Sequence, residues 1–427
     1  MSQDTFPSVD RPDPHPWRAA VALGVVAIGV TMLGGFVLGV WFRHDRAWQI
    51  AGDVWVPLRA AEAIVDGHLT HLYASTPLFV AMPLLPILLV PVAEVGRVLH
   101  LTQSIPTEIP RPTIWLVYGP WGLASGIVFL AAFRALATEV GIRRGRAWLQ
   151  TVVTVIVLGP VAVGYGHYED VLALAFLMLS LRAAFRERFV AAALLLGLAI
   201  GFKQWAVLAL PVLVSIAPRE ARRRTVLAAA AIPAALAAMV LPFDWHHASR
   251  ALFEARSFPG AGHVALWISR SHAPLVSTPF RIGAVVAAIA AAVAIRGRAE
   301  PPVVLGALAV VFFARLLFEP VVFSYYVGPP LAFAVLHERL RTGRTLRTLV
   351  VGGALLLLFQ WRPAPILWWP EAAVLGVVLA APAARELRPG RVSSTRAQAP
   401  ALAPSSPPRP PGPPRSDPRG PSPSPLP

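Results

Sequence analysis

Long apolar runs recur along this chain and constrain its fold more than any other feature. About 20 apolar residues in a helix cross the hydrocarbon core of a bilayer. Because backbone polar groups find no water there, such runs are expected to be helical. The candidate spans are residues 19–41, 77–98, 114–138, 148–164, 171–185, 225–241, 279–295, 302–318, 321–337, 348–360 and 367–384. The sequence therefore predicts an all-α, polytopic membrane protein with about 11–13 apolar segments.

The charged residues support this class. Only 14% of the residues are charged, against about 25% in an average soluble domain. The net charge of +16 comes from arginines that fall mostly in short loops between apolar runs and in the C-terminal tail. Such positions are typical of topology signals, so we expect no nucleic-acid partner. The chain has no cysteine, which excludes disulfides, iron–sulfur clusters and thiolate metal sites.

Arginine placement predicts which side of the membrane each loop faces, because cytoplasmic loops carry an excess of basic residues. The arginine-rich turns expected in the cytoplasm are residues 143–146, 186–188, 219–224, 296–298 and 339–347. Residues 42–76 and 242–278 are then two long outer loops of one transmembrane domain, residues 19–384, in the plasma membrane. A polar leader, residues 1–18, and a disordered tail rich in Pro, Ser and Arg, residues 385–427, are expected to be cytoplasmic.

Two apolar segments do not fit single straight spans. Residues 77–98 contain four prolines, and interior prolines kink or break a helix. We expect a re-entrant or broken pair of short helices there, lining a cavity. Residues 189–202 and 204–217 are each too short to span, and the alternation of loops requires them to form a hairpin. Lys203 then lies at the outer tip of this hairpin.

Lys203 is the only lysine among 38 basic residues, and apolar runs flank it on both sides. One interpretation is snorkelling, in which the ammonium reaches the outer interface. The other is an anion contact, because a compact ammonium can serve as a point contact for phosphate. Arg315 and Glu319 stand one helical turn apart and form an ion pair in the simplest interpretation. Alternatively, Arg315 faces the same cavity as Lys203, and Glu319 orients it.

Acidic residues mark two further places on the outer side. Asp53 lies near the start of an amphipathic helix expected over residues 53–64, where it is either an N-cap or a functional carboxylate. His167, Glu169 and Asp170 meet at the turn between two spans. These three residues either cap and solvate the start of a helix, or bind substrate and transfer protons.

Weaker candidates complete the set of possible site residues. Asp244 lies at the end of a span. Tyr325 and Tyr326 either belong to the interfacial aromatic belt or stack on a ring. His246 and His247 are adjacent, but they have no assured carboxylate partner, so we expect no metal site.

Several of these pieces together resemble a known family. An early Asp53 is followed by Gly67 and Tyr73, then by the proline-rich PLFVAMPLLPILLVPVA, and later by GLAIGFKQWAVLALP around Lys203. This pattern of sparse positions, spread over most of residues 19–384, resembles the DUF2029 group of the GT-C glycosyltransferases. That group is related to polyprenol-phosphate-mannose-dependent mannosyltransferases.

The resemblance implies a GT-C-like arrangement of helices and a hexosyltransferase, with mannose as the expected sugar. It implies a polyprenyl-phosphate donor, a lipid or glycan acceptor, and inverting transfer on the outer face without nucleotide, metal or other cofactor. Asp53 would be the general base, and Lys203, with Arg315, would contact the donor phosphate. Two positions depart from the family pattern: Gly166-His167-Tyr168-Glu169 stands where Gly-Gln-x-Asn is common, and Gln204 where Pro is common.

Two other functions remain open from the residues alone. A transporter or lipid flippase also places polar residues within the membrane, although the chain shows no internal repeat typical of many transporters. A membrane scaffold would recruit partners through the Pro/Arg-rich tail.

Overall fold

The computed structural model describes most of the central part of the chain. The described residues are 55–100, 112–142, 167–253, 262–263, 273–319, 321–322, 324–343, 348, 352, 370, 373–374 and 376–387. The predictions for Asp53, for the leader, for the spans at 19–41 and 148–164, and for the tail beyond residue 387 lie outside these residues.

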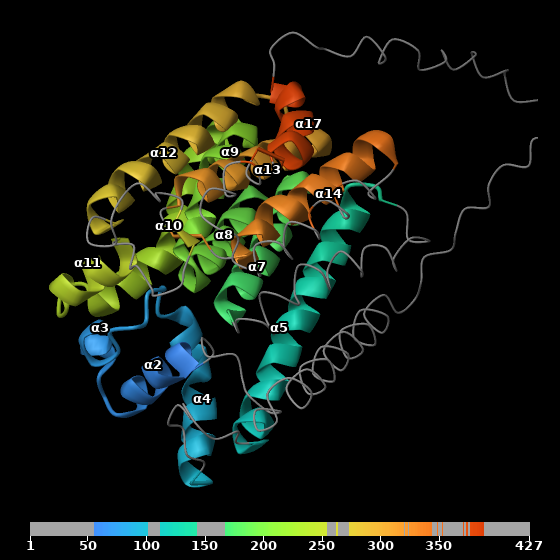
Figure 1. The fold of residues 1–427 in the computed structure, drawn as a ribbon. Helices are drawn as coiled ribbons and strands as arrows, with labels where there is room; N and C mark the ends of the chain where they lie inside the picture. The colour runs from blue at the N-terminus through green and yellow to red at the C-terminus, as the bar shows by residue number, and fades with distance from the viewer. Residues whose placement is uncertain are drawn as a thin grey trace, which may run out of the picture. The chain divides into compact units, whose positions relative to one another are not determined.

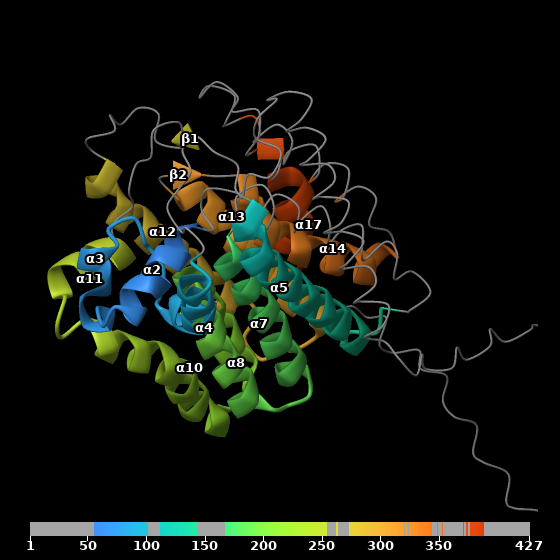
Figure 2. The ribbon, with the colours of Figure 1, turned by 90° about the horizontal axis from the view of Figure 1, so that it is seen from below.

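Apart from one short pair of strands, the regular secondary structure of the described residues is helical, so the all-α prediction is confirmed (Figure 1). The strands β1 (Gly262–His263) and β2 (Val321–Val322) pair antiparallel (Figure 2). The helices and helical turns are α2 (Trp55–Val65), η2 (Leu69–His71), α3 (Leu72–Ser75), α4 (Leu84–Val98), α5 (Pro112–Glu139), α7 (Tyr168–Phe185), α8 (Phe189–Phe202), η5 (Gln204–Ala209), α9 (Leu210–Ile216), α10 (Arg219–Val240), α11 (Trp245–Phe253), α12 (Ala273–Ala294), α13 (Pro301–Phe318), η7 (Ser324–Val327), α14 (Gly328–Thr342), η9 (Gly376–Ala380), α17 (Ala381–Ala384) and η10 (Arg385–Leu387).

Five of the predicted spans correspond to one described helix each. Helices α5, α7, α10, α12 and α13 overlap the spans predicted over 114–138, 171–185, 225–241, 279–295 and 302–318, respectively. The span predicted over 321–337 is displaced, because α14 begins only at Gly328. Pro329 and Pro330 occupy the first turn of α14, where a missing backbone N–H costs no hydrogen bond, and they set this start.

Two of the described helices, α10 and α13, are long and apolar enough to cross a membrane by length and composition. They differ in their surroundings. Helix α13 is largely buried within the protein, whereas α10 exposes much of its apolar surface, including Val226, Leu227 and Met239. Helix α8 and residues 204–216 are apolar but shorter. An exposed apolar surface such as that of α10 is expected to contact either a protein partner or lipid.

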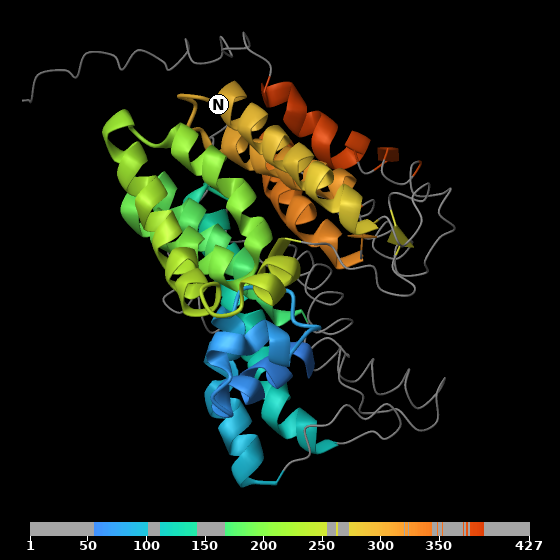
Figure 3. The ribbon, with the colours of Figure 1, turned by 90° about the vertical axis from the view of Figure 1, so that its left-hand side faces the viewer.

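The segment around Lys203 forms the predicted hairpin. Helix α8 packs between α7 and α10 (Figure 3). Gly197 of α8 faces Ala229 of α10, and Gly201 faces Leu236, so these two helices run in the same direction. Residues 204–218 must therefore run back towards the start of α10. This return path consists of the 3-10 helix η5 followed by the short α-helix α9, where one half-length helix was predicted over 204–217, and it places Lys203 at the turn.

The contact between α8 and α10 yields a test of this packing. A Cβ atom on Gly197 would lie 2.9 Å from the carbonyl oxygen of Ala229, which is backbone and cannot turn away. Gly197→Ala is therefore expected to lower the free energy of unfolding by about 1–3 kcal/mol, in spite of the better helix propensity of alanine. The measurement is the thermal unfolding midpoint of the purified protein in detergent.

Gly201→Ala is the matched control for this substitution. Its new Cβ would meet side chains and no backbone: the ends of Leu84 and Leu236 lie at 3.1 and 3.0 Å and can rotate, and Ile232 lies at an ordinary contact distance of 3.5 Å. We expect a smaller change than for Gly197→Ala. Equal midpoints for the two variants would mean that the backbones of α8 and α10 are not in contact at Gly197.

Residues 77–98 contain one short helix instead of the predicted pair. Helix α4 has 15 residues, which corresponds to about 22 Å and is shorter than the hydrocarbon core. It remains a single helix because Pro86 lies in its first turn, where backbone N–H groups have no partner within the helix. Only Pro91 lies in its interior. The prediction that this segment is not a full-length straight span is confirmed, and the prediction of two helices is wrong.

The segment before α4 belongs to a second, smaller core. Tyr73 and Phe79 pack there with Val240 of α10 and with Ala248 and Leu252 of α11. Helix α2 ends at Val65, close to the expected end, and Gly67 follows with a φ of +85°. Few residues other than glycine adopt that left-handed conformation, so Gly67 allows the chain to turn towards α3.

Candidate functional site

Most of the predicted site residues converge at the hairpin tip. The ammonium Nζ of Lys203 lies 2.9 Å from Oε1 of Glu169 and 3.3 Å from Oδ2 of Asp170. Nδ1 of His167 lies 2.9 Å from the same Glu169 oxygen. We call His167, Glu169, Asp170 and Lys203 the Lys203 cluster. Glu169, Asp170 and Lys203 are 6%, 7% and 8% exposed, so these charges are held almost entirely away from water.

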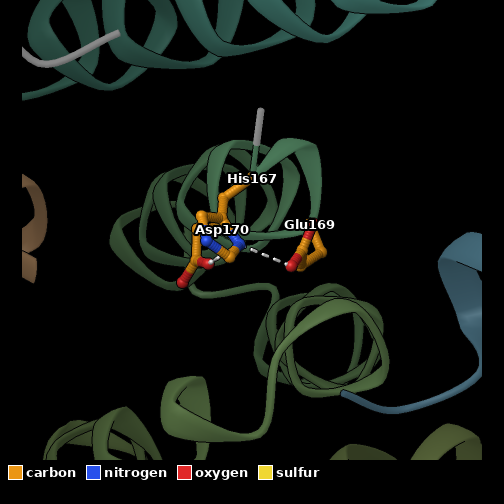
Figure 4. A group of neighbouring side chains, drawn as sticks. All are labelled: His167, Glu169 and Asp170. Atoms are coloured by element: carbon orange, nitrogen blue, oxygen red, sulfur yellow. Dashed lines mark hydrogen bonds and ion pairs between the residues drawn. The ribbon is translucent and has the colours of Figure 1, made fainter. Parts of the chain in front are cut away.

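The first turn of α7 supplies three members of the Lys203 cluster (Figure 4). His167 occupies the N-cap position, and its side chain makes no capping hydrogen bond. Acidic residues favour the first turn of a helix because its backbone N–H groups carry partial positive charge. Glu169 and Asp170 nevertheless direct their side chains to the hairpin: Oδ1 of Asp170 accepts a hydrogen bond from Nε1 of Trp205 at 2.5 Å. The interpretation of these two acids as a cap and a solvated charge is therefore wrong.

Lys203 ends α8 in an extended conformation, with φ −149° and ψ 122°. Its side chain extends to α7 and makes a hydrogen bond to Glu169. The snorkelling interpretation is wrong because the ammonium is buried and pairs with carboxylates. An ammonium has three donors in a compact group, which suits a position between two carboxylates.

Three members of the Lys203 cluster carry side chains of the kinds that ligate metal ions. One ligand atom from each of His167, Glu169 and Asp170 lies within 4.8 Å of the others. However, the Lys203 ammonium already lies about 3 Å from the same carboxylates. A divalent cation placed there would be repelled by this neighbouring positive charge. The donor set therefore suits a metal only if Lys203 moves away.

Arg315 lies near the end of α13 between two aromatic rings. Its guanidinium carbon is 4.5 Å from the ring centroid of Tyr326 and 5.4 Å from that of Trp205. Such cation–π contacts hold a guanidinium in place without using its N–H groups. Nε of Arg315 is 3.8 Å from Oε2 of Glu319, which is an ion pair beyond hydrogen-bond length. Among the described residues, no acceptor makes a hydrogen bond with the Arg315 guanidinium, although the residue is only 8% exposed.

Tyr325 and Tyr326 of η7 connect the Lys203 cluster with Arg315. The Tyr325 ring lies 4.3 Å from the His167 ring, and Tyr325 meets Tyr326 edge to face at 4.7 Å. Tyr325 is 4% exposed, so it packs inside the protein. The interpretation of Tyr325 as a residue of the interfacial aromatic belt is therefore wrong. The alternative, stacking on a ring of the substrate, stays a prediction.

Two residues of this region were not predicted. Trp205 donates to Asp170 and also lies against Arg315, so it joins the Lys203 cluster to the arginine. Arg281 of α12 reaches Oε1 of Glu319 at 4.0 Å. Trp205 stands only two residues after the single lysine, and this proximity is the signal that could have identified it. Nothing in the sequence connects Arg281, 38 residues earlier, with Glu319.

Asp244 makes its contacts elsewhere. Its carboxylate accepts a hydrogen bond from the backbone N–H of Ala74 at 2.9 Å and lies 2.6 Å from Nδ1 of His247. It thereby ties α3 to the start of α11. Burial raises the pKa of the neighbouring Tyr73 above its ordinary value, and the charge of Asp244 raises it further. The Tyr73 hydroxyl remains protonated and donates a hydrogen bond to the carbonyl of Ala81. These contacts favour a structural role for Asp244.

Comparison with known proteins identifies the class to which part of the chain is similar. Residues 118–219 match a family model described as alpha-(1->6)-mannopyranosyltransferase, N-terminal domain. This stretch is about a quarter of the chain. It includes α7, α8 and the hairpin, and so contains the whole Lys203 cluster and Trp205. No curated protein matches the chain.

Proposed function

We propose that this protein is an integral-membrane mannosyltransferase that uses a polyprenyl-phosphate-linked sugar. The observation that carries the proposal is the position of the family match, because residues 118–219 contain the whole Lys203 cluster. A glycosyltransferase requires groups that bind hydroxyls and a cation that meets the leaving phosphate. Glu169 and Asp170 offer carboxylate oxygens that can bind hydroxyls, and Arg315 offers the cation for the phosphate.

A multi-pass arrangement in the plasma membrane is part of the proposal. The apolar surface of α10 and the length of α13 support it. The hairpin tip at Lys203 would then face the outer side, and the arginine-rich turn at 219–224 would face the cytoplasm. The C-terminal tail would lie in the cytoplasm as well. A lipid-linked donor could reach such a site sideways from the bilayer.

The proposed reaction is a single inverting displacement. The acceptor hydroxyl attacks the anomeric carbon, and the bond from that carbon to the phosphate oxygen breaks. The phosphate oxygen keeps the bonding electron pair and leaves as polyprenyl phosphate. Asp53 would accept the proton of the acceptor hydroxyl, as the family resemblance implies. A fixed cation near the phosphate lowers the barrier because negative charge develops there during the reaction.

The contacts favour Arg315 over Lys203 as the main phosphate contact. Two buried carboxylates within 3.3 Å neutralise the ammonium of Lys203 and would repel an anion. The guanidinium of Arg315, by contrast, has only one long ion pair among the described residues. Its aromatic neighbours leave its N–H donors available for a phosphate.

Arg315→Ala is expected to lower the rate of mannosyl transfer by about 10²–10³-fold. Arg315→Lys should recover part of the loss, because it keeps the charge but not the planar two-pronged grip. The measurement is transfer of radiolabelled mannose from polyprenyl-phosphate mannose to an envelope lipid or glycan fraction by purified protein. Arg97→Ala, which removes an exposed arginine paired with Glu94, is the control and should retain full activity.

Three outcomes of this assay would contradict the proposal. Transfer from a nucleotide sugar but not from the lipid-linked sugar would reject the donor. Full activity of Arg315→Ala would reject the phosphate contact. Movement of the intact donor across a vesicle membrane, without any covalent product, would indicate a flippase instead of a transferase.

A further inference from the structure

Two carboxylate oxygens of the Lys203 cluster lack a hydrogen bond. Oε1 of Glu169 and Oδ1 of Asp170 accept hydrogen bonds from Lys203 and Trp205, respectively. Oε2 of Glu169 and Oδ2 of Asp170 are buried and accept no hydrogen bond among the described residues, although Oδ2 of Asp170 is ion-paired with the Lys203 ammonium at 3.3 Å. A buried acceptor without a donor is costly, and in a native protein it is met by a partner such as an ordered water, an ion or a ligand.

The charges around these oxygens restrict what can bind there. An anion would be repelled by two carboxylates, and a divalent cation would be repelled by the Lys203 ammonium. A neutral group with several donors avoids both penalties, and hydroxyl groups have this chemistry. The ring of Tyr325 lies beside the cluster, against His167. An aromatic ring next to buried acceptors is an arrangement that suits a sugar.

We propose that Glu169 and Asp170 form a subsite that accepts hydrogen bonds from hydroxyl groups of the transferred sugar. Lys203 is then a positioning residue, which holds the two carboxylates charged and in place. This inference rests on the proposed function, because it assigns one end of the same substrate. The sequence prediction has Lys203, with Arg315, contacting the donor phosphate. In this proposal Lys203 instead positions the residues that bind the sugar, and Arg315 contacts the phosphate.

Trp205 is the link between the two ends of the substrate site. Its indole N–H donates to Asp170, and its ring lies against the guanidinium of Arg315. The sugar subsite and the phosphate contact are therefore separated by one rigid side chain. A sugar phosphate that engages both would be bound through its hydroxyls at one end and its charge at the other.

Comparing the binding of two lipids, one with the sugar and one without it, tests the sugar subsite separately from the phosphate contact. Purified protein in nanodiscs is titrated with polyprenyl-phosphate mannose and with polyprenyl phosphate, which lacks the sugar. Wild type is expected to bind the sugar-bearing lipid more tightly. Glu169→Gln and Asp170→Asn are each expected to weaken its binding about tenfold or more, since each loses a charge-assisted acceptor. Their affinity for polyprenyl phosphate should stay within about twofold of wild type.

Glu338→Gln is the matched control, because Glu338 of α14 is also a buried carboxylate but accepts hydrogen bonds from the backbone N–H and the hydroxyl of Thr348. It should leave both affinities unchanged. Equal affinities of wild type for the two lipids would overturn the sugar subsite, and this comparison needs no variant to fold. Equal losses for both lipids in the two cluster variants would also overturn it.

The same titration distinguishes the subsite from the proposed function and from a metal site. If wild type bound neither lipid, the lipid-linked donor itself would be wrong. If a chelator abolished binding of the sugar-bearing lipid and Mg²⁺ or Mn²⁺ restored it, the carboxylates would hold a metal, and the hydroxyl subsite would be rejected. Binding that is insensitive to the chelator supports direct contact with the sugar.

Discussion

Replacing Lys203 by methionine is expected to lower the free energy of unfolding by about 3–5 kcal/mol. Methionine fills a similar volume but removes the ammonium, so Glu169 and Asp170 lose the cation that both of them contact. Two like charges would then remain buried near each other with little compensation. The measurement is thermal unfolding of the purified variant in detergent, compared with wild type.

A second substitution tests whether charge is the cause. In the double variant Lys203→Met, Glu169→Gln one of the two uncompensated charges is gone, so we expect part of the lost stability to return. Arg97→Met is the control for loss of a basic residue, because its pair with Glu94 is exposed and worth less than about 1 kcal/mol. Wild-type stability of Lys203→Met would show that the cluster is not a stabilising ion pair.

Asp53→Asn is expected to reduce the rate of mannosyl transfer by about 10²–10⁴-fold, the range attributed to a general base. An amide of the same shape cannot accept the proton of the acceptor hydroxyl. Binding of polyprenyl-phosphate mannose should be unchanged, because Asp53 is proposed to act on the acceptor. The measurement is the rate of transfer at saturating donor, with donor binding measured on the same sample.

Asp66→Asn is the matched control for the Asp53 substitution. Asp66 follows α2 in the same predicted outer loop and is exposed. Its loss should leave the rate within about twofold of wild type, since exposed surface substitutions usually have small effects. An undiminished rate for Asp53→Asn would remove its role as base, whereas an equal loss in both variants would indicate a general effect of charge in this loop.

Helix positions were largely predictable, because each apolar run carries its own signal. The runs at 114–138 and 302–318 became α5 and α13 with only small changes at their ends. The errors occur where local chemistry overrides hydrophobicity. Pro329 and Pro330 delay the start of α14. Pro86 is tolerated in the first turn of α4, so residues 84–98 form one helix.

The candidate residues were also named from sequence, but their roles were not. The sequence singled out Glu169, Asp170 and Lys203 from their charge within apolar surroundings. It left capping, solvation and snorkelling open for them, and the buried contacts exclude all three. Trp205 was missed because a tryptophan after an apolar helix is usual for a membrane protein. Its indole contact with Asp170 depends on where the hairpin turns.

By itself, the sequence determined the helical class, the two half-length helices around Lys203 and the residues whose charge demands a partner. These properties are local, since apolar length, proline positions and isolated charges can be counted along the chain. Only the tertiary structure decided which partner each charge takes. Helices α7 and α8 are joined by a short turn at residues 186–188 and pack along each other, so the end of α8 returns to the start of α7, and this brings a lysine 34 residues away to Glu169. Pairing across that distance depends on helix packing, which no local pattern encodes.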